Sequence, residues 1–175
     1  MKVETKFVIG NKQGVDTLAF VAVATTRQKF AGKISDRQLD EYISASFNPD
    51  VLMVELNSLS NQYLIVYLEG QPVGYARVTS KGTRPPMFDG KTLARIADFN
   101  VLEEHSADAV IKSLFEKCLS LTARQQVVWI NEYEFDPFLA VFEGYGFKRN
   151  NDIAFYKELP LASVSLIKDS LLNSA

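Results

Sequence analysis

Residues 100–117, NVLEEHSADAVIKSLFEK, contain the transition that decides the fold. They read as the end of a strand, a short acidic turn and the start of an amphipathic helix. The apolar positions recur with the i, i+3, i+4, i+7 spacing of a helix that buries one face: Ala107, Val110, Ile111, Leu114, Phe115 and Cys118. The turn contains no glycine, and Asp108 places a negative charge in the first helical turn. Because free N–H groups at a helix N-terminus bind anions, this turn bears directly on what the chain binds.

Two predicted strands flank this helix and form a β-α-β unit with it. They are TLARIADFNVL (92–102) and QVVWINEYEF (126–135). Upstream, QYLIVYLEGQPVGYARVTS (62–80) is typical of a β-hairpin. Downstream, DPFLAVFEGYGF (136–147) predicts a short helix that ends at its glycines, and IAFYKEL (153–159) predicts a last strand.

The N-terminal third adds a strand, VETKFVI (3–9), and a group of helices. Ser35 is the expected N-cap of one helix, and Pro49 lies at the first position of another. This order predicts one α/β (α+β) domain, with a mixed, mostly antiparallel twisted sheet and helices on both faces. Residues 160–175 show loose helical spacing, so we expect a C-terminal helical tail that packs on its own domain or on a second subunit, as in a homodimer.

Composition excludes several classes of protein. The 175 residues are 47% hydrophobic and 23% charged, which fits one globular domain. Nineteen basic and 21 acidic residues, with the basic ones scattered, argue against nucleic-acid binding. A single cysteine, expected to be buried, and a single histidine do not favour a metal site. The opening residues lack the apolar run of a signal peptide and no segment is long enough to span a membrane, so a cytoplasmic protein is expected.

The strand at 92–102 supplies a candidate general base. Strict alternation places Asp98 on one face together with Ala94, Ile96 and Asn100. Apolar neighbours raise the pKa of a carboxyl group, which would suit Asp98 to accept a proton. The competing interpretation is a charge at the sheet edge or in a hydrogen bond.

The order of elements, with two local stretches, resembles the GNAT superfamily of acetyl-CoA-dependent N-acetyltransferases. The stretches are YLIVYLEGQPVGYARV, similar to a strand hairpin of that family, and FLAVFEGYGFK, similar to its last helix and turn. The N-terminal region resembles a subgroup that acetylates polyamines and small amines. The likeness covers residues 1–158 and implies a GNAT-like acyltransferase domain over residues 1–159. It implies acetyl-CoA as co-substrate and a small-molecule or protein amine as acceptor.

The resemblance also implies where the coenzyme binds. The family's glycine-bearing pyrophosphate turn corresponds here to Ser106, Ala107, Asp108, Ala109, Val110 and Ile111. All three glycine positions carry larger residues, and the Asp108 carboxylate would repel a pyrophosphate. Ordinary helix capping by Ser106 is an equally good interpretation of this turn. The family's pantetheine-binding strand end corresponds to Phe99, Asn100 and Val101, and Phe135 replaces an asparagine that often contacts the pantetheine arm.

The acid and base are less well defined. Phe142 occupies the position of the family's proton-donating tyrosine and has no proton to give. Tyr145 lies one turn later and is a candidate, with Tyr133, Tyr156 or water as alternatives. We expect Glu132 and Glu134 to form an acidic mouth for a cationic amine, although surface carboxylates often have no such role.

Two functions of different classes follow from these observations. The first is an N-acetyltransferase that acts on a primary amine. The alternative is a catalytically degenerate GNAT-fold binding or interaction protein that no longer uses acetyl-CoA, motivated by Asp108, the missing glycines and Phe142. A third, weaker hypothesis is an acyltransferase with a different acyl carrier.

Overall fold

The computed structural model describes residues 1–153 and 157–170. The helices are α1 (Lys12–Phe30), α2 (Asp36–Ser46), α3 (Pro49–Leu56), α4 (Asp108–Thr122) and α5 (Leu139–Gly144), with short 3₁₀ turns at Pro86–Phe88 and Glu103–His105. The strands are β1 (Val3–Phe7), β2 (Asn61–Leu68), β3 (Gln71–Thr79), β4 (Leu93–Val101), β5 (Val127–Tyr133), β6 (Lys148–Asn150) and β7 (Ser163–Asp169). Within this described part of the chain, no helix has the length and apolarity needed to cross a membrane.

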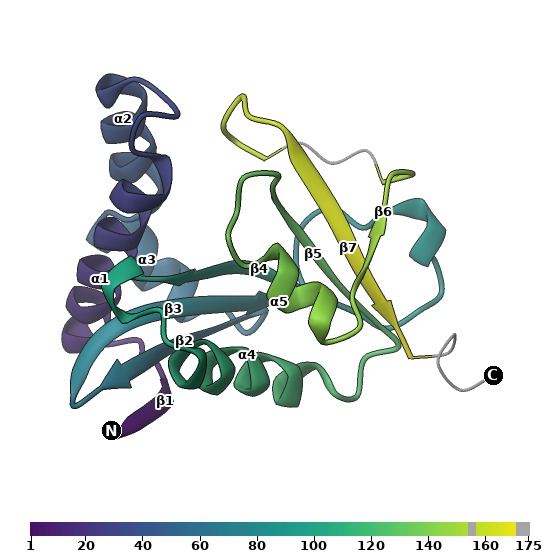
Figure 1. The fold of residues 1–175 in the computed structure, drawn as a ribbon, viewed down its shortest axis with the longest axis horizontal. Helices are drawn as coiled ribbons and strands as arrows, with labels where there is room; N and C mark the ends of the chain where they lie inside the picture. Colours follow the sequence, from purple (N-terminus) through teal and green to yellow (C-terminus); the bar gives the residue numbers. More distant parts are fainter. Residues whose placement is uncertain (154–156, 171–175) are drawn as a thin grey trace.

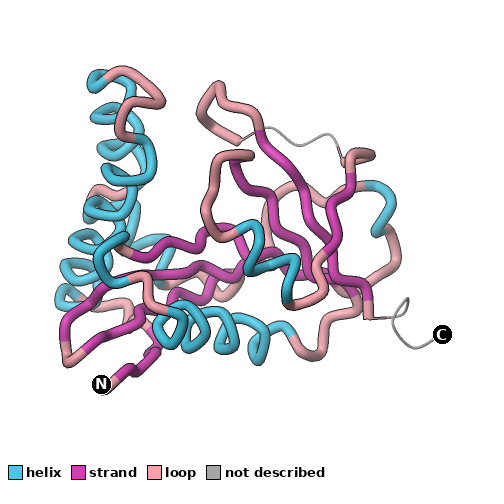
Figure 2. Tube along the Cα trace, viewed as in Figure 1, coloured by secondary structure: helices cyan, strands magenta, loops and turns pink. Residues whose placement is uncertain are grey.

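The strands form one sheet in the order β1-β2-β3-β4-β5-β7-β6. The β4–β5 pair is parallel, and the other five pairs are antiparallel. Helices cover both faces of this sheet (Figures 1 and 2). On one face, α4 and α5 close the main core around Phe115 and Phe142. On the other face, α1 and α3 pack against β2 and β3 through Leu18 and Leu52. The predicted fold class is therefore confirmed.

Local sequence explains where the N-terminal helices begin. The Ser35 hydroxyl accepts a hydrogen bond from the Gln38 N–H, and the Gln38 side-chain oxygen accepts one from the Ser35 N–H, which completes a capping box. Asn48 caps α3 with Pro49 at its first position. Both starts lie where the sequence predicts them.

Strands β4 and β5 separate at their carboxyl ends. Their pairing begins at Leu93 and Val127 and ends at Ile96 and Ile130. Beyond this point β4 continues beside β3, whereas β5 continues beside β7. Figure 1 shows the two halves of the sheet running in different directions. We call the place where β4 and β5 part, beyond Ile96 and Ile130, the opening.

A β-bulge in β4 corrects the predicted alternation. Ile96 pairs with Val78 and Asp98 pairs with Arg77, so Ala97 is an additional residue between them. The bulge reverses the faces: Phe99 joins Ile96 in the main core, whereas Asp98 faces α2 and α3. The expectation that Asp98 shares a face with Ala94 and Ile96 is therefore wrong.

The C-terminal segment also differs from the prediction. Residues 163–169 are strand β7, which lies between β5 and β6, and not a helical tail after a domain that ends at residue 159. Val164 and Leu166 alternate into the main core as a strand requires. Of the strand predicted at 153–159, residues 154–156 lie outside the described residues, and the described remainder is not in a strand.

Candidate active site

A first cavity of about 330 Å³ lies where β4 and β5 separate. Its walls come from the C-terminal part of α1, the end of β4 and the segment between β5 and α5. Among the predicted coenzyme-binding residues, Asn100, Val101 and Phe135 line it. Ligands of α/β sheets commonly bind in such a crevice at the carboxyl ends of parallel strands.

The backbone of β4 presents hydrogen-bonding groups to this opening. Leu102 N–H donates to the Val73 carbonyl at 2.8 Å, and Asn100 pairs with Tyr75 of β3. Because successive residues of a strand point their peptide groups in opposite directions, those of Phe99 and Val101 point away from β3 and toward the opening. The ring of Phe99, in contrast, is buried against Phe115 and Phe142. Only the backbone of this residue is therefore available to a ligand.

The N-terminus of α4 has no side-chain cap. Ala107 is the N-cap residue, and the Ser106 hydroxyl donates instead to the Glu103 carbonyl at 2.7 Å. Capping by Ser106 is therefore wrong as a prediction. Asp108 and Ala109 are exposed in the first turn. Since the first N–H groups of a helix have no partner within it, this turn presents backbone donors outward.

The two residues that follow, Val110 and Ile111, point inward. Val110 is fully buried, and Ile111 packs against the main core, as its position in the apolar stripe predicted. Their N–H groups are bonded to the Ala107 carbonyl. Within the predicted pyrophosphate turn, residues 106–111, the backbone N–H groups that face outward therefore belong to residues before Val110.

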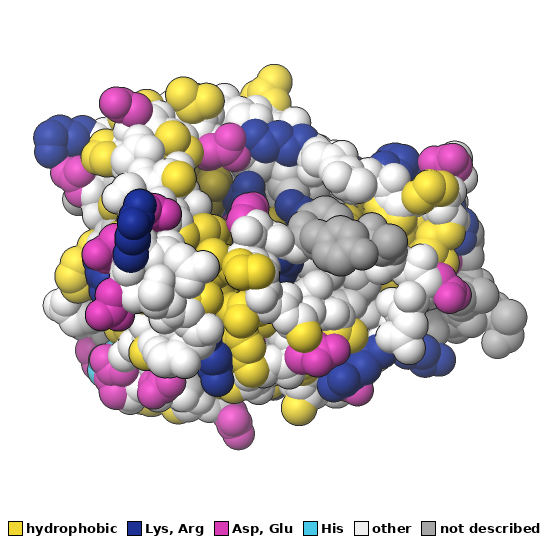
Figure 3. All heavy atoms as spheres, turned by 90° about the horizontal axis from the view of Figure 1, so that it is seen from above, with side chains coloured by type: hydrophobic (Ala, Val, Ile, Leu, Met, Phe, Trp, Pro, Cys, Tyr) yellow, Lys and Arg dark blue, Asp and Glu magenta, His cyan; other side chains and the backbone are white. Residues whose placement is uncertain are grey.

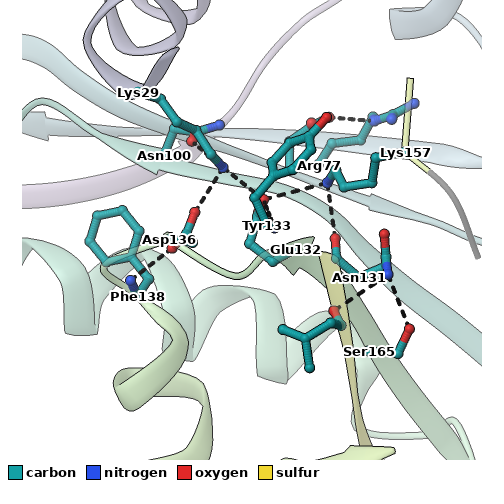
Figure 4. A network of polar contacts seen from close by, with 12 residues as sticks. Lys29, Arg77, Asn100, Asn131, Glu132, Tyr133, Asp136, Phe138, Lys157 and Ser165 are labelled. Atoms are coloured by element: carbon teal, nitrogen blue, oxygen red, sulfur yellow. Dashed lines mark hydrogen bonds and ion pairs between the residues drawn. The ribbon is translucent and has the colours of Figure 1, made fainter. Parts of the chain in front are cut away.

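Lys29, which the sequence analysis did not select, lies at the centre of a buried polar network (Figure 4). Its ammonium nitrogen lies 2.8 Å from Glu132 Oε1, 2.7 Å from Asp136 Oδ2 and 3.3 Å from Asn100 Oδ1. Its side chain is only 11% exposed. Burial disfavours the charge, but Glu132 and Asp136 outweigh this and raise the pKa of Lys29. Lys29 thus connects β4 to β5 across the opening, and its two acidic partners favour its charged form.

Glu132 is the second centre of this network. Its carboxylate accepts a hydrogen bond from Tyr133 N–H and lies 3.5 Å from the Lys157 ammonium. Burial opposes its ionisation, but Lys157 and Lys29 together lower the pKa of Glu132. Glu132 is 2% exposed, whereas Glu134 is on the surface. The two residues therefore do not form the open acidic mouth that we predicted.

A second cavity, of about 280 Å³, lies on the side of α2 and α3. Asp98 lines it and is ion-paired with Arg77 at 2.8 Å. Burial favours the neutral form, but the Arg77 guanidinium outweighs it, and the pKa of Asp98 lies below its usual value. The raised pKa that we predicted for Asp98 is therefore wrong.

The buried network lies between the two cavities. Lys29 lines the first cavity, Lys157 lines the second, and both contact Glu132. The two ammonium groups also lie near the Tyr133 ring, 5.6 Å and 5.1 Å from its centre. A group bound in either cavity therefore lies next to the same buried charges.

The remaining candidate acids are not brought to this site. Phe142 is fully buried in the main core. The Tyr145 hydroxyl donates to Glu116 at 3.2 Å, and burial and this carboxylate raise the pKa of Tyr145. Tyr145 lines neither cavity. Tyr156 lies outside the described residues.

No protein-family model matches the sequence. Solved structures resemble the chain over nearly its whole length. PaiA N-acetyltransferase from Thermoplasma acidophilum, in complex with coenzyme A, has a TM-score of 0.77 and 13% identity and covers 97% of this chain and 99% of its own. A GNAT-family acetyltransferase from Staphylococcus aureus has a TM-score of 0.65 and 13% identity, covering 96% and 99%. An aminoglycoside acetyltransferase from an uncultured soil metagenomic sample has a TM-score of 0.64 and 16% identity, covering 93% and 100%.

Proposed function

We propose that this chain, which has the GNAT acetyltransferase fold, transfers an acetyl group from acetyl-CoA to a primary amine. The observation that carries the proposal is the opening between β4 and β5 beside the uncapped N-terminus of α4. It offers an extended backbone edge for a flexible arm and outward N–H groups for an anion. Acetyl-CoA combines such an arm with a pyrophosphate.

The residues present fit this co-substrate. The peptide groups of Phe99 and Val101 would bind the pantetheine arm in the first cavity. The cavity reaches Glu103, just before the turn, where N–H groups of Asp108 and Ala109 would bind the pyrophosphate. Alanine is the smallest side chain that can replace glycine there. The charge of Asp108 would weaken this binding without blocking it.

The acceptor would enter from the second cavity and meet the thioester near Asn100. Its nitrogen attacks the thioester carbonyl, so that the C–N bond forms, the C–S bond breaks and the amine gives one proton to water. Backbone N–H groups at the opening would stabilise the oxyanion. The departing thiolate takes its proton from water, and Lys29, whose charge is shared by Glu132 and Asp136, would hold the wall of the first cavity in place. This assignment needs no hydroxyl at Phe142.

Calorimetric titration of acetyl-CoA tests the proposal. We expect saturable binding by the wild-type protein, tightened about two- to fivefold in Asp108→Asn, because this change removes one repulsive charge next to the phosphates. Asp50→Asn is the matched control, since Asp50 lies in the first turn of α3. No saturable binding by any of the three proteins would overturn the proposal.

A GNAT-fold binding protein without catalysis is the second candidate. The observation in its favour is that no tyrosine is among the described residues that line the first cavity. Release of free coenzyme A thiol in the presence of a primary amine distinguishes the two candidates. Acetyl-CoA binding without thiol release across a broad panel of amines would favour the second.

A further inference from the structure

We infer that the outer edge of β1 pairs with the same edge of a second copy of this chain, which joins the two sheets into one. β1 is the first strand in the order of the sheet, and among the described strands it pairs with β2 alone. Figure 1 shows it at the margin of the sheet, next to the N-terminus. Strands β2 and β3 lie between this edge and β4, so the pairing does not depend on the proposed function.

The backbone of β1 divides its hydrogen-bonding groups between two sides. Val8 N–H donates to the Tyr63 carbonyl at 3.0 Å, so the even-numbered residues of this segment face β2. Because successive residues of a strand direct their peptide groups to opposite sides, the odd-numbered residues point theirs outward: Val3, Thr5 and Phe7. Among the described strands, none lies on that side to bond them. An antiparallel copy of β1 would form about six backbone hydrogen bonds with these groups.

One register of two such strands places opposite charges across from each other. Because the odd-numbered residues carry the outward peptide groups, a twofold axis near the middle of β1 passes through Glu4, Thr5 or Lys6. An axis at Glu4 or at Lys6 places like charges directly opposite each other, which is destabilising. An axis at Thr5 instead places each Glu4 opposite Lys6 of the second copy. The charges of β1 therefore favour pairing about Thr5.

The same register matches the apolar side chains. Phe7 lies opposite Val3 of the second copy, an aromatic and β-branched pair of the kind that stabilises sheets. Both side chains lie on the face covered by α4, since Val3 packs against the main core and the Lys117 ammonium lies 5.2 Å from the Phe7 ring. Phe7 is 50% exposed in the single chain. Met1 and Ile9, which are 77% and 70% exposed, flank the strand at positions that meet in this register.

Charged side chains on a short edge strand commonly prevent pairing, so those of β1 have to be compatible with it. The Glu4 carboxylate lies 3.2 Å from the Lys2 ammonium and 3.3 Å from the Lys6 ammonium of its own strand. All three side chains are at least 40% exposed, so these ion pairs are weak and rearrange in water. A carboxylate also accepts from more than one ammonium group. Each Lys6 can therefore bond Glu4 of the second copy without losing its own partner.

Alternating charge along one extended strand is suited to a copy of itself, because an antiparallel partner presents the same sequence reversed. The face seen from above offers no comparable match. Among the described residues of that face, Figure 3 shows basic and acidic side chains interspersed, without a broad region of one sign. The observations on β1 thus favour a second copy of this chain as its partner.

Sedimentation equilibrium of the full chain tests this pairing. We expect a monomer–dimer equilibrium with a micromolar Kd, because a strand edge of this length buries a small area. Glu4→Lys should weaken the dimer about tenfold or more, since both Glu4–Lys6 pairs become repulsive. Arg37→Glu, a charge reversal on exposed α2, is the control and should leave Kd unchanged. A protein that stays monomeric up to about 500 µM would overturn the inference.

A mixture of two variants tests the register itself. Lys6→Glu should weaken self-association as Glu4→Lys does. Mixed in equal amounts, the two variants should form a heterodimer as stable as the wild-type dimer, because every lysine then faces a glutamate. A variant that is merely misfolded would not be rescued in this way. Absence of the heterodimer, or self-association of both variants at the wild-type Kd, would contradict the pairing about Thr5.

The backbone hydrogen bonds have their own test. Thr5→Pro removes the central outward N–H and leaves the bonds between β1 and β2 in place, so it should abolish the dimer. Thr5→Val is the matched control and should remain dimeric. Both variants lose the hydrogen bond between the Thr5 and Ser113 hydroxyls, so that loss does not separate them. A Thr5→Pro dimer as tight as that of Thr5→Val would show that another surface associates.

Discussion

The ammonium group of Lys29 has three hydrogens and meets three acceptors, one each from Asn100, Glu132 and Asp136. These acceptors come from β4, from β5 and from the segment that follows β5. A single cation therefore bridges the two sides of the opening and is shared by two buried acidic side chains, of which Asp136 has its pKa raised by burial and by Glu132. Removing one partner of such a buried network leaves uncompensated charge in a low-dielectric site.

Lys29→Met should consequently be strongly destabilising. We expect a loss of about 3–5 kcal/mol in the free energy of unfolding at pH 7, measured by urea denaturation. The bare carboxylates of Glu132 and Asp136 then repel each other, which raises their pKa values in the folded state. A raised carboxyl pKa stabilises the fold below that pKa, so the deficit should shrink at pH 5.

The matched control is Lys12→Met. Lys12 pairs with Asp16 at the surface, with 90% of its side chain exposed, and its loss should change stability little. A loss below about 1 kcal/mol in Lys29→Met would contradict the assigned role.

Asp98 gives the opposite pH dependence. Its pKa is lowered in the fold, so the Asp98–Arg77 pair stabilises the protein fully above the ordinary carboxyl pKa of about 3.9. This contribution is lost as the pH falls through the lower pKa of the folded state. Wild type should therefore exceed Asp98→Asn in stability at pH 7, and the gap should close toward pH 3.

Urea midpoints at pH 7, 4 and 3 measure this gap. Glu134→Gln, on the exposed surface, serves as the control, and its midpoints should follow those of the wild type. A gap between wild type and Asp98→Asn that is equal at pH 7 and pH 3 would rule out the ion pair as its source.

At the scale of elements, the N-terminus of α4 lacks the stabilisation that a capping side chain would give. An uncapped helix start leaves N–H groups for a ligand, whereas a capping side chain would occupy them. Ala107→Asp should raise stability by about 1 kcal/mol through capping and should weaken acetyl-CoA binding. Thermal unfolding with and without acetyl-CoA measures both effects.

Ala107→Ser separates capping from charge. It should stabilise α4 to a similar degree but weaken acetyl-CoA binding less, because serine adds no negative charge. If both variants are stabilised and bind acetyl-CoA as tightly as the wild type, this turn does not hold the phosphates.

The sequence predicts elements well where their signals are local. The N-cap at Ser35 and the apolar stripe of α4 involve neighbours three or four residues apart, and both are confirmed. The β4 bulge depends on how β3 pairs with it, so strict alternation misplaced Asp98. Lys29 was missed for the same reason, because Asn100 and Glu132 lie 71 and 103 residues away in the sequence.

Three residues of the first cavity were selected from the sequence: Asn100, Val101 and Phe135. Resemblance to a family supplied the long-range information that local patterns lack. The same resemblance did not locate the acid or the acceptor site. Those depend on side chains such as Phe142 and Asp98, whose surroundings only the assembled sheet defines.

At the scale of the whole molecule, strand β7 of the C-terminal segment holds β5, one side of the candidate site, in the sheet. It pairs with all seven residues of β5 and buries Val164 and Leu166 in the main core. Ser165 accepts a hydrogen bond from the buried Asn131 side chain at 3.0 Å, next to Glu132. The segment that was predicted to be a helical tail thus contains an interior strand of the sheet.

Truncation after Pro160 should therefore abolish folding, because it removes the partner of both β5 and β6 and exposes the edge of a fully buried strand. We expect an insoluble product or one without a cooperative urea transition. In the full-length chain, Leu166→Ala should still fold but lose about 2–5 kcal/mol, since Leu166 is fully buried. Lys148→Ala, on the exposed side of β6, is the control and should unfold like the wild type. A soluble truncated protein with the wild-type transition would show that residues 161–175 are a tail after all, and that β5 holds the opening without β7.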